Sequence, residues 1–280
     1  MQIKNRALRV GLFLLLFSLA ILFLAPIFIV LMNSFKGKFD IMSSPFTLPN
    51  TDTFIGLENY IKGATASGFF GAFLNSLWIT IASVAAILLF TSMTAWFLTR
   101  SKLKLCKAIY YALIFSMIVP FQMVMYTMTY VVNRIQFNNL LGIIVVYLGF
   151  GAGLSVFMLS GFVRSIPIDV EQAAMIDGCT PITTFFRIIL PILKPTVITV
   201  AILNTMWVWN DYLLPYLILG TGKNKTIPVA VQIALQGAYG SVDWGGFMAM
   251  LVLAIIPIVL FYLLCQKYII SGVLAGAVKG

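Results

Sequence analysis

Long uncharged runs of apolar residues, separated by polar segments, dominate the hydrophobic pattern of this chain. Six runs are long enough to cross about 30 Å of hydrocarbon as helices that rise about 1.5 Å per residue. Only the fifth run contains an ionisable side chain, Asp211. Backbone groups in lipid must be hydrogen-bonded within the segment, and the alternating polarity of barrel strands is absent, so we expect an all-α membrane protein. The six predicted transmembrane helices are residues 10–32, 73–98, 108–133, 140–163, 195–219 and 244–266.

Composition supports a protein that uses the lipid bilayer as its solvent. Of the 280 residues, 61% are hydrophobic and 9% are charged, whereas a soluble domain carries about 25% charged residues. The chain has no His, which excludes Ser–His catalysis and HExxH zinc sites. We therefore expect one transmembrane domain, residues 1–280, with no enzymatic activity and no metal site. The first run is longer than the apolar core of a signal peptide and is expected to be a retained helix.

Basic residues are distributed unevenly among the polar segments, and this bias predicts the orientation. With the N-terminus placed inside, twelve Lys and Arg residues fall on cytoplasmic segments and six on external segments. Such a bias predicts that both the N- and C-termini are cytoplasmic. The net charge of +10 is therefore interpreted as a topology signal, and no nucleic-acid partner is expected. Cys106, Cys179 and Cys265 fall on or near the predicted cytoplasmic side, where thiols stay reduced.

The predicted cytoplasmic loop, residues 164–194, carries strong helix signals outside the spans. Pro167 suits a first helical position, and Asp169 and Glu171 fall in the first turn, where the helix dipole favours anions. Gly178 can take the left-handed conformation that ends a helix. The sequence therefore predicts a short helix that ends at this glycine.

A second short helix is predicted after the glycine. Thr180 is its expected cap and Pro181 its first residue, and Pro191 is expected to end it before the fifth span. Together the two helices would form an elbow that passes a rigid-body push from a cytoplasmic partner into the membrane helices. From the residues alone, an interfacial helix pair that only links two spans is an equal alternative.

The elbow resembles the EAA loop of binding-protein-dependent ABC transporter permeases. The glycine lies seven residues after the glutamate, as in that family, and an Ile-Leu-Pro element follows. Gln172 is a departure, because the family has Ala directly after the glutamate. The residues that the resemblance assigns to coupling with an ATPase are Glu171, Ala173, Ala174, Asp177, Gly178 and Pro191.

Further motifs are similar to the maltose-type (MalG-like) carbohydrate permeases. Asn75-Ser76 opens the second span, Pro120-Phe121-Gln122 lies in the third, and Trp209-Asn210-Asp211 lies in the fifth. The final segment, residues 271–280, also matches. The resemblance implies the type I ABC importer permease fold, a location in the bacterial cytoplasmic membrane, and import of a sugar or oligosaccharide.

The same resemblance implies partners. They are a second permease subunit, two ATPase subunits and an extracytoplasmic sugar-binding protein. The ATPase subunits would bind ATP, and no cofactor is expected on this chain, which lacks the GxxxxGK[ST] phosphate loop. The elbow would dock in a cleft of the ATPase. The external loop 220–243 would reach into the binding protein, and residues 275–280 would reach the ATPase interface.

Polar side chains within the spans are the candidates for contact with a carbohydrate. Neutral amides and nearby aromatic rings suit the hydroxyls and apolar faces of a sugar, although the same groups also bond membrane helices to one another. For Asp211, a position on the pathway and a local role as a cap or pairing partner are both left open. The pathway candidates are Asn75, Gln122, Asn204, Asn210 and Asp211.

A stand-alone secondary carrier or channel is the alternative function. Such carriers often contain two related halves with matching broken helices, and no internal repeat is evident in this sequence. An aspartyl intramembrane protease would need two membrane Asp residues, whereas the predicted spans contain one. The sequence therefore favours a transport subunit that depends on a separate ATPase.

Overall fold

The computed structural model describes residues 6–236 and 242–277, with side chains for 8–236 and 242–268. In these ranges the secondary structure is helical apart from isolated β-bridges. The chain divides into two compact units, Met1–Phe70 with Ala230–Pro257, and Gly71–Val229 with Ile258–Gly280. The expectation of an all-α protein is confirmed.

The first unit contains the helices of the chain's beginning and the start of its last helix. They are α1 (Arg6–Asn33), α2 (Lys38–Ser43), α3 (Glu58–Ser67) and the first part of α13 (Trp244–Ala277). α1 is apolar on all sides, and most of its large side chains are exposed, as expected of a helix surrounded by lipid. At Gly63 of α3, an added Cβ would lie 3.1 Å from the Gly246 carbonyl oxygen, so α3 and α13 are in close contact there.

The segment between α1 and α3 is held by buried polar side chains. The Asn59 amide donates hydrogen bonds of 2.9 Å to the carbonyl oxygens of Ser34 and Lys36. The Lys36 side chain is fully buried, and its Nζ donates to the Ser44 carbonyl oxygen at 2.9 Å and to Thr47 Oγ1 at 3.3 Å. These bonds give hydrogen-bond partners to carbonyl oxygens of the turns that follow α1.

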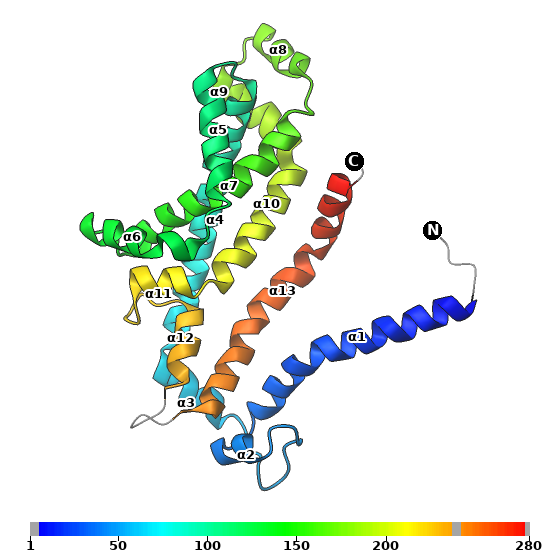
Figure 1. The fold of residues 1–280 in the computed structure, drawn as a ribbon, viewed down its shortest axis with the longest axis vertical. Coiled ribbons are helices and arrows are strands. Elements are labelled where there is room, and N and C mark those ends of the chain that lie inside the picture. The colour runs from blue at the N-terminus through cyan, green and yellow to red at the C-terminus, as the bar shows by residue number, and fades with distance from the viewer. Residues whose placement is uncertain (1–5, 237–241, 278–280) are drawn as a thin grey trace. The chain divides into compact units, whose positions relative to one another are not determined.

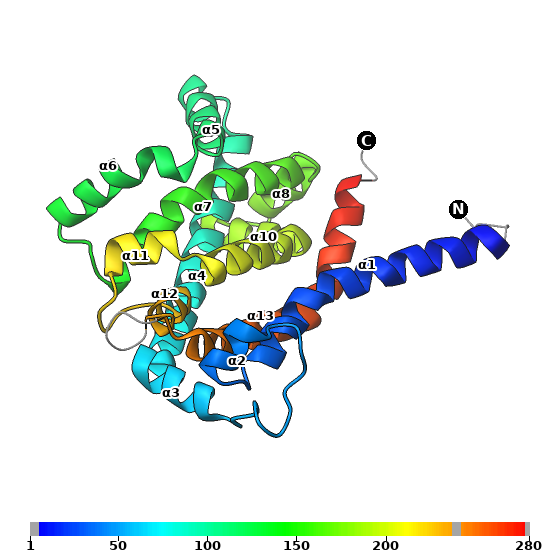
Figure 2. The same ribbon diagram turned by 60° about the horizontal axis from the view of Figure 1, so that its bottom comes forward.

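The second unit forms a bundle around α7. α7 packs against α5 and α10, and residues of α4, α7 and α10 share one apolar cluster (Figures 1 and 2). Gly151 of α7 allows this approach, because an added Cβ would lie 2.7 Å from Ile87 Cδ1 and 3.0 Å from Asn204 Oδ1. The elements that lie wholly or mostly in this unit are α4 (Phe69–Arg100), α5 (Lys104–Ser116), α6 (Phe121–Arg134), α7 (Leu140–Val163), α8 (Ile168–Ile176), α9 (Pro181–Thr184), the π-helical turn η1 (Phe185–Ile189), α10 (Leu190–Asn210) and α11 (Leu213–Leu219). α12 (Ile227–Ala234) begins in this unit, and its residues from Ala230 onward belong to the first unit.

The third predicted span is not one continuous helix. α5 and α6 are bent by 108° at a break between Ser116 and Phe121. Pro120 adopts an extended conformation with φ −61° and ψ 136°. Because proline supplies no N–H and disfavours a helical residue before it, the helix ends before Pro120 and a new one begins after it. Residues 6–236 and 242–277 therefore contain five helices long and apolar enough to span a membrane, or six if the bent pair counts as one span.

The helix at the fifth predicted span, 195–219, begins and ends at other residues than that span. The helix runs from Pro181 to Asn210, because α9, η1 and α10 are continuous. Asp211 is extended, with ψ 121°, and α11 is a separate helix. Pro191 does not end a helix as expected. The Leu190 N–H donates to the Phe185 carbonyl oxygen five residues back, and the missing N–H of a proline is tolerated where the hydrogen bonds change register.

Candidate functional site

The predicted elbow is formed by α8, the turn after it and α9. Asp169 and Glu171 lie in the first turn of α8, and Asp177 is its last flanking residue. Gly178 has φ +84°, and no atom lies within 4 Å of the position that a Cβ would take. The left-handed glycine is thus confirmed, and it is required by the backbone rather than by a close neighbour.

Thr180 caps the second helix as predicted. Its Oγ1 accepts a hydrogen bond from the Thr183 N–H at 3.3 Å, and Pro181 is the first residue of α9. Downstream, Phe185 and Ile189 are buried with Val163 in an apolar cluster. The second arm of the elbow is therefore fixed to the end of α7 and continues directly into α10.

The residues assigned to coupling divide into two groups. Ala173, Asp177 and Gly178 are exposed, whereas Glu171 and Ala174 are buried. Pro191 is exposed but belongs to the first turn of α10 and not to the elbow. α8 also exposes large apolar side chains at Met175 and Ile176, and Ile176 is 86% exposed.

The Glu171 carboxylate is turned towards the end of α4. Arg100 Nε donates to Glu171 Oε1 at 2.7 Å, and Trp96 Nε1 donates to Glu171 Oε2 at 3.0 Å. Arg100 Nη2 also donates to the Ile166 carbonyl oxygen at 2.8 Å. Sequence reasoning missed Arg100 and Trp96. A basic residue at the end of a span was the available signal, since an acid that becomes buried requires a cationic partner.

Two of the pathway candidates are held within the second unit by hydrogen bonds. Asn204 is buried in α10, and its amide donates to Ser155 Oγ at 3.2 Å and to the Val200 carbonyl oxygen at 2.9 Å. The Asn75 amide donates at 3.0 Å to the carbonyl oxygens of both Lys223 and Lys225. Asn75 thereby holds the segment before α12 against the start of α4.

The other two amide candidates are more exposed. Asn210 is the last residue of α10, and its amide donates to the Met206 carbonyl oxygen at 2.7 Å. Gln122 is exposed in the first turn of α6. These two residues are not brought together with Asn75 or Asn204 by any bond described for the second unit.

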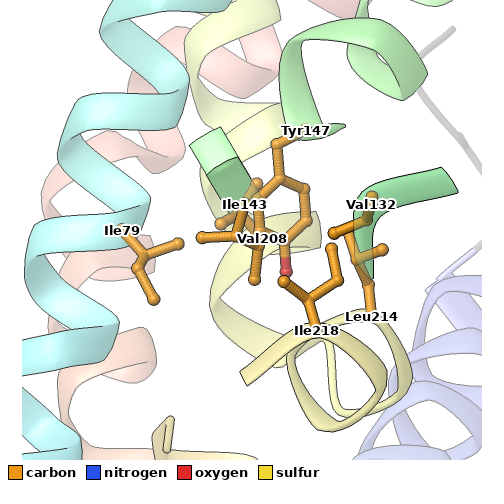
Figure 3. Close-up of a cluster of buried hydrophobic side chains, with 7 residues drawn as sticks. All are labelled: Ile79, Val132, Ile143, Tyr147, Val208, Leu214 and Ile218. Carbon is orange, nitrogen blue, oxygen red and sulfur yellow. The ribbon is translucent and has the colours of Figure 1, made fainter. Parts of the chain in front are cut away.

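Asp211 is a cap between two helices. Its Oδ1 accepts from the N–H groups of Leu213 and Leu214 at 3.1 and 3.3 Å, at the start of α11. Its Oδ2 accepts from the Tyr147 hydroxyl at 3.1 Å. Tyr147 is fully buried among apolar side chains from α4, α6, α7, α10 and α11 (Figure 3). The structure thus realises the local role left open for Asp211, and Tyr147 is the partner that the sequence did not reveal.

Some expected features lie partly outside the described residues. Residues 237–241 of the external loop 220–243, and residues 278–280 of the C-terminal segment, are among them. Within residues 6–236 and 242–277, no group of three or more His, Cys, Asp or Glu side chains could hold a metal ion.

Comparison with known proteins places the chain among transport permeases. Residues 87–274 match the family described as binding-protein-dependent transport system inner membrane component. The chain is 38% identical to the permease protein AmyC of Thermoanaerobacterium thermosulfurigenes, named for transport of starch degradation products, over 93% of each chain. It is also 38% identical to the multiple sugar-binding transport system permease protein MsmG of Streptococcus mutans, covering 92% of this chain and 93% of the relative.

A solved structure has the same fold. A chain of a bacterial ABC transporter that imports the acidic polysaccharide alginate matches with a TM-score of 0.77, covering 96% of this chain and 99% of that one at 19% identity. The ABC importer permease fold expected from the resemblance is therefore confirmed. From the match over residues 87–274 and the two permease relatives, the chain belongs to the family of binding-protein-dependent transport system inner membrane components.

Proposed function

We propose that this chain is the permease subunit of an ATP-driven importer that carries a sugar or oligosaccharide across the cytoplasmic membrane. The family membership and the relatives named for starch products and multiple sugars support a carbohydrate substrate. A further relative, MelC of Bacillus subtilis, is named for melibiose, raffinose and stachyose and is 33% identical. These relatives are named for different sugars, and what they share is a carbohydrate substrate.

The proposed assembly contains this chain, a second permease, two ATPase subunits and an external sugar-binding protein. A solved structure of similar fold is an alginate ABC transporter in complex with its periplasmic protein, which supports the external partner. ATP would be held by the ATPase subunits, and this chain would need no cofactor. Both termini and the elbow would face the cytoplasm, in keeping with the bias of basic residues.

The observation that carries the coupling role is the exposed face of the elbow. Ala173, Met175 and Ile176 are exposed residues of α8 among the residues that the structure describes, and Ala173 and Ile176, three positions apart, share one face of the helix. Contiguous exposed apolar surface marks a protein interface when it faces water, and Ile176 offers the most exposed large apolar side chain of α8 for such a contact. A cleft of the ATPase is the proposed partner surface, and Gly178 allows the chain to turn sharply beside it.

Gly178→Val tests the coupling role in the assembled transporter in proteoliposomes. A β-branched side chain cannot readily adopt φ +84°, so the elbow should distort, and sugar uptake per ATP hydrolysed should fall by about tenfold. Gly56→Val is the matched control, because Gly56 also has a positive φ, +64°, with open space around it, but lies far from the elbow in the chain. Unchanged coupling in Gly178→Val, with a normal amount of bound ATPase, would contradict the proposed role.

The same preparation tests the importer itself. Uptake should require ATP, the ATPase subunits and the binding protein. Sugar flux through the purified chain without the ATPase subunits would instead support a stand-alone carrier and contradict the proposal.

Gln122 is the pathway candidate whose surroundings best suit a sugar. Tyr126 and Tyr130 follow at intervals of one turn on the same face of α6, and all three side chains are exposed. An amide beside aromatic rings can bond hydroxyls and pack on apolar ring faces. Asn75, Asn204, Asn210 and Asp211 have bonding partners within the chain, so we propose mainly supporting roles for them.

A further inference from the structure

The Arg100 side chain connects α4 to the beginning of the coupling helix α8 at two points. Its Nε donates to Glu171 Oε1 at 2.7 Å, and its Nη2 donates to the carbonyl oxygen of Ile166 at 2.8 Å. Ile166 precedes the Pro167 cap, and Glu171 lies in the first turn of α8. One guanidinium therefore fixes both the entry to α8 and its first turn.

Burial makes this ion pair different from an exposed one. The Glu171 side chain is 4% exposed and that of Arg100 is 20% exposed. Both carboxylate oxygens have a donor, because Trp96 Nε1 lies 3.0 Å from Oε2. Removal of one partner from such a pair leaves a buried charge without compensation, whereas an exposed pair contributes little.

Trp96 extends the connection to the second arm of the elbow. Its ring lies 5.6 Å from the ring of Phe185 in η1. Trp96 also packs against the buried cluster of Val163, Ile166, Phe185, Ile189 and Leu193. The end of α4 thus touches the end of α7, the start of α8 and the π-helical turn that leads into α10.

We infer that Arg100 and Trp96 are positioning residues that make the coupling helix and the end of α4 move as one body. Along the chain, α8 is joined only to α7 and to the helix containing α10. The contact with α4 joins residues 71 positions apart and gives a push on α8 a second route into the bundle. This inference rests on the proposed coupling function, and it assigns Glu171 to a contact inside this chain instead of the ATPase surface.

The test uses the complete transporter in proteoliposomes and measures three quantities: co-purified ATPase, ATP hydrolysis stimulated by the binding protein, and sugar moved per ATP hydrolysed. Arg100→Gln should lower the sugar-to-ATP ratio by about tenfold, the factor expected for loss of a charge-assisted bond. Trp96→Phe keeps an aromatic ring but removes the indole donor, and should lower the ratio by about threefold. Lys102→Gln is the matched control, since it removes an exposed positive charge two positions away and should leave the ratio unchanged.

A merely structural role would reduce the amount of assembled complex without changing the ratio. The charge exchange combines Arg100→Glu with Glu171→Arg. Its sugar-to-ATP ratio should be about threefold higher than that of Arg100→Glu alone or Glu171→Arg alone, because opposite charges again face each other. If the transporter with Arg100→Gln does not assemble, the sugar-to-ATP ratios of Trp96→Phe and of the charge exchange test the inference.

Three results would overturn the inference: a wild-type ratio in assembled Arg100→Gln, a wild-type ratio in Trp96→Phe with no recovery in the exchange, or loss of ATPase binding in Glu171→Gln alone. In each of these cases normal ATP-dependent uptake by the wild-type complex would leave the proposed function intact. Absence of such uptake would contradict the proposed function itself.

Discussion

Two buried charges in this chain are accommodated in different ways. Glu171, in the second unit, is neutralised by Arg100 and also bonded by Trp96. Lys36, in the first unit, is fully buried, but its Nζ bonds only the neutral oxygens of Ser44 and Thr47. Burial lowers the pKa of Lys36, and the nearby charge of Asp40 opposes that effect. The Glu171 charge therefore holds helices in place, whereas the Lys36 charge is buried without an ion-pair partner among the described residues, at a cost in desolvation free energy.

The difference concerns what each charge connects. The Glu171 pair joins helices whose relative position matters for the proposed coupling, and Arg100 has no neutral substitute with the same planar set of donors. The Lys36 ammonium closes a local loop, where polar bonds span 8 and 11 residues. A long apolar side chain could fill the Lys36 site, but no apolar side chain could replace Arg100 while Glu171 remains.

The largest expected effect comes from breaking the paired charge. Arg100→Ala should lower the free energy of unfolding by about 3 kcal/mol, because the buried Glu171 carboxylate loses its cation. Thermal unfolding of the purified transporter in detergent would measure the loss. Glu171→Gln together with Arg100→Ala should recover part of that loss, and the absence of any recovery would contradict an uncompensated carboxylate as its cause.

Asp211 provides an intermediate case, a carboxylate bonded only by neutral donors. Asp211→Ala should cost about 2 kcal/mol, since it removes the cap of α11 and leaves the buried Tyr147 hydroxyl without its acceptor. Asp211→Asn keeps the capping oxygen and should cost about 1 kcal/mol or less. The two variants are compared by thermal unfolding and by uptake kinetics. Lost uptake in a fully stable Asp211→Asn protein would point to the pathway role instead.

Removing the unpaired charge should have a small effect. Lys36→Met retains most of the side-chain length and eliminates the desolvation of an ammonium, while the Ser44 carbonyl oxygen loses a donor. The opposing changes should keep the difference in unfolding free energy below about 1 kcal/mol. If Lys36→Met lowered the free energy of unfolding as much as Arg100→Ala does in the same assay, Lys36 would be as important for stability as the Glu171 ion pair, and the proposed difference between the two sites would be wrong.

The pH dependence linked to Lys36 is the smallest expected effect. Its pKa in the folded protein is lower than the ordinary value of 10.5. Between these two pKa values the unfolded chain binds more protons at this residue than the folded chain, so stability should rise with pH across that window. The difference in stability between wild type and Lys36→Met, followed by unfolding at alkaline pH, should show this slope. A slope of opposite sign would exclude a lowered pKa.

The length of the uncharged apolar runs predicted the continuous helices well and the broken ones poorly. The predicted span 140–163 coincides with α7, where the Asn139 side chain accepts from the N–H groups of Leu141 and Gly142. Pro120 was expected to kink one span. The complete separation of α5 from α6 there and the break at Asp211 were not predicted, because average hydropathy stays high across both. Each break depends on one residue's extended backbone, and at Asp211 also on a carboxylate that caps the next helix.

The candidate site was predictable in its local part only. The turn at Gly178 and the cap at Thr180 depend on adjacent residues, and both were predicted from the sequence. The direction of Glu171 depends on Arg100, which is distant in the chain, and no local pattern on α8 reveals which face is covered. Similarly, Tyr147 becomes the partner of Asp211 only when α7 and α10 pack together.

The π-helical turn Phe185–Ile189 determines how far the elbow is rotated about the helix axis relative to α10. A π-helical turn accommodates about one residue more than the α-helix it interrupts, and each residue of an α-helix rotates the side chains by about 100°. In α9 and η1, Thr184 and Phe185 are buried, while Leu193 and Val200 are buried further along in α10. Because of the extra residue, the buried face of α9 is rotated about the helix axis relative to the face that an uninterrupted α-helix would bury. An insertion or deletion within this turn would therefore rotate the elbow about the helix axis while every side chain that contacts a partner stayed the same.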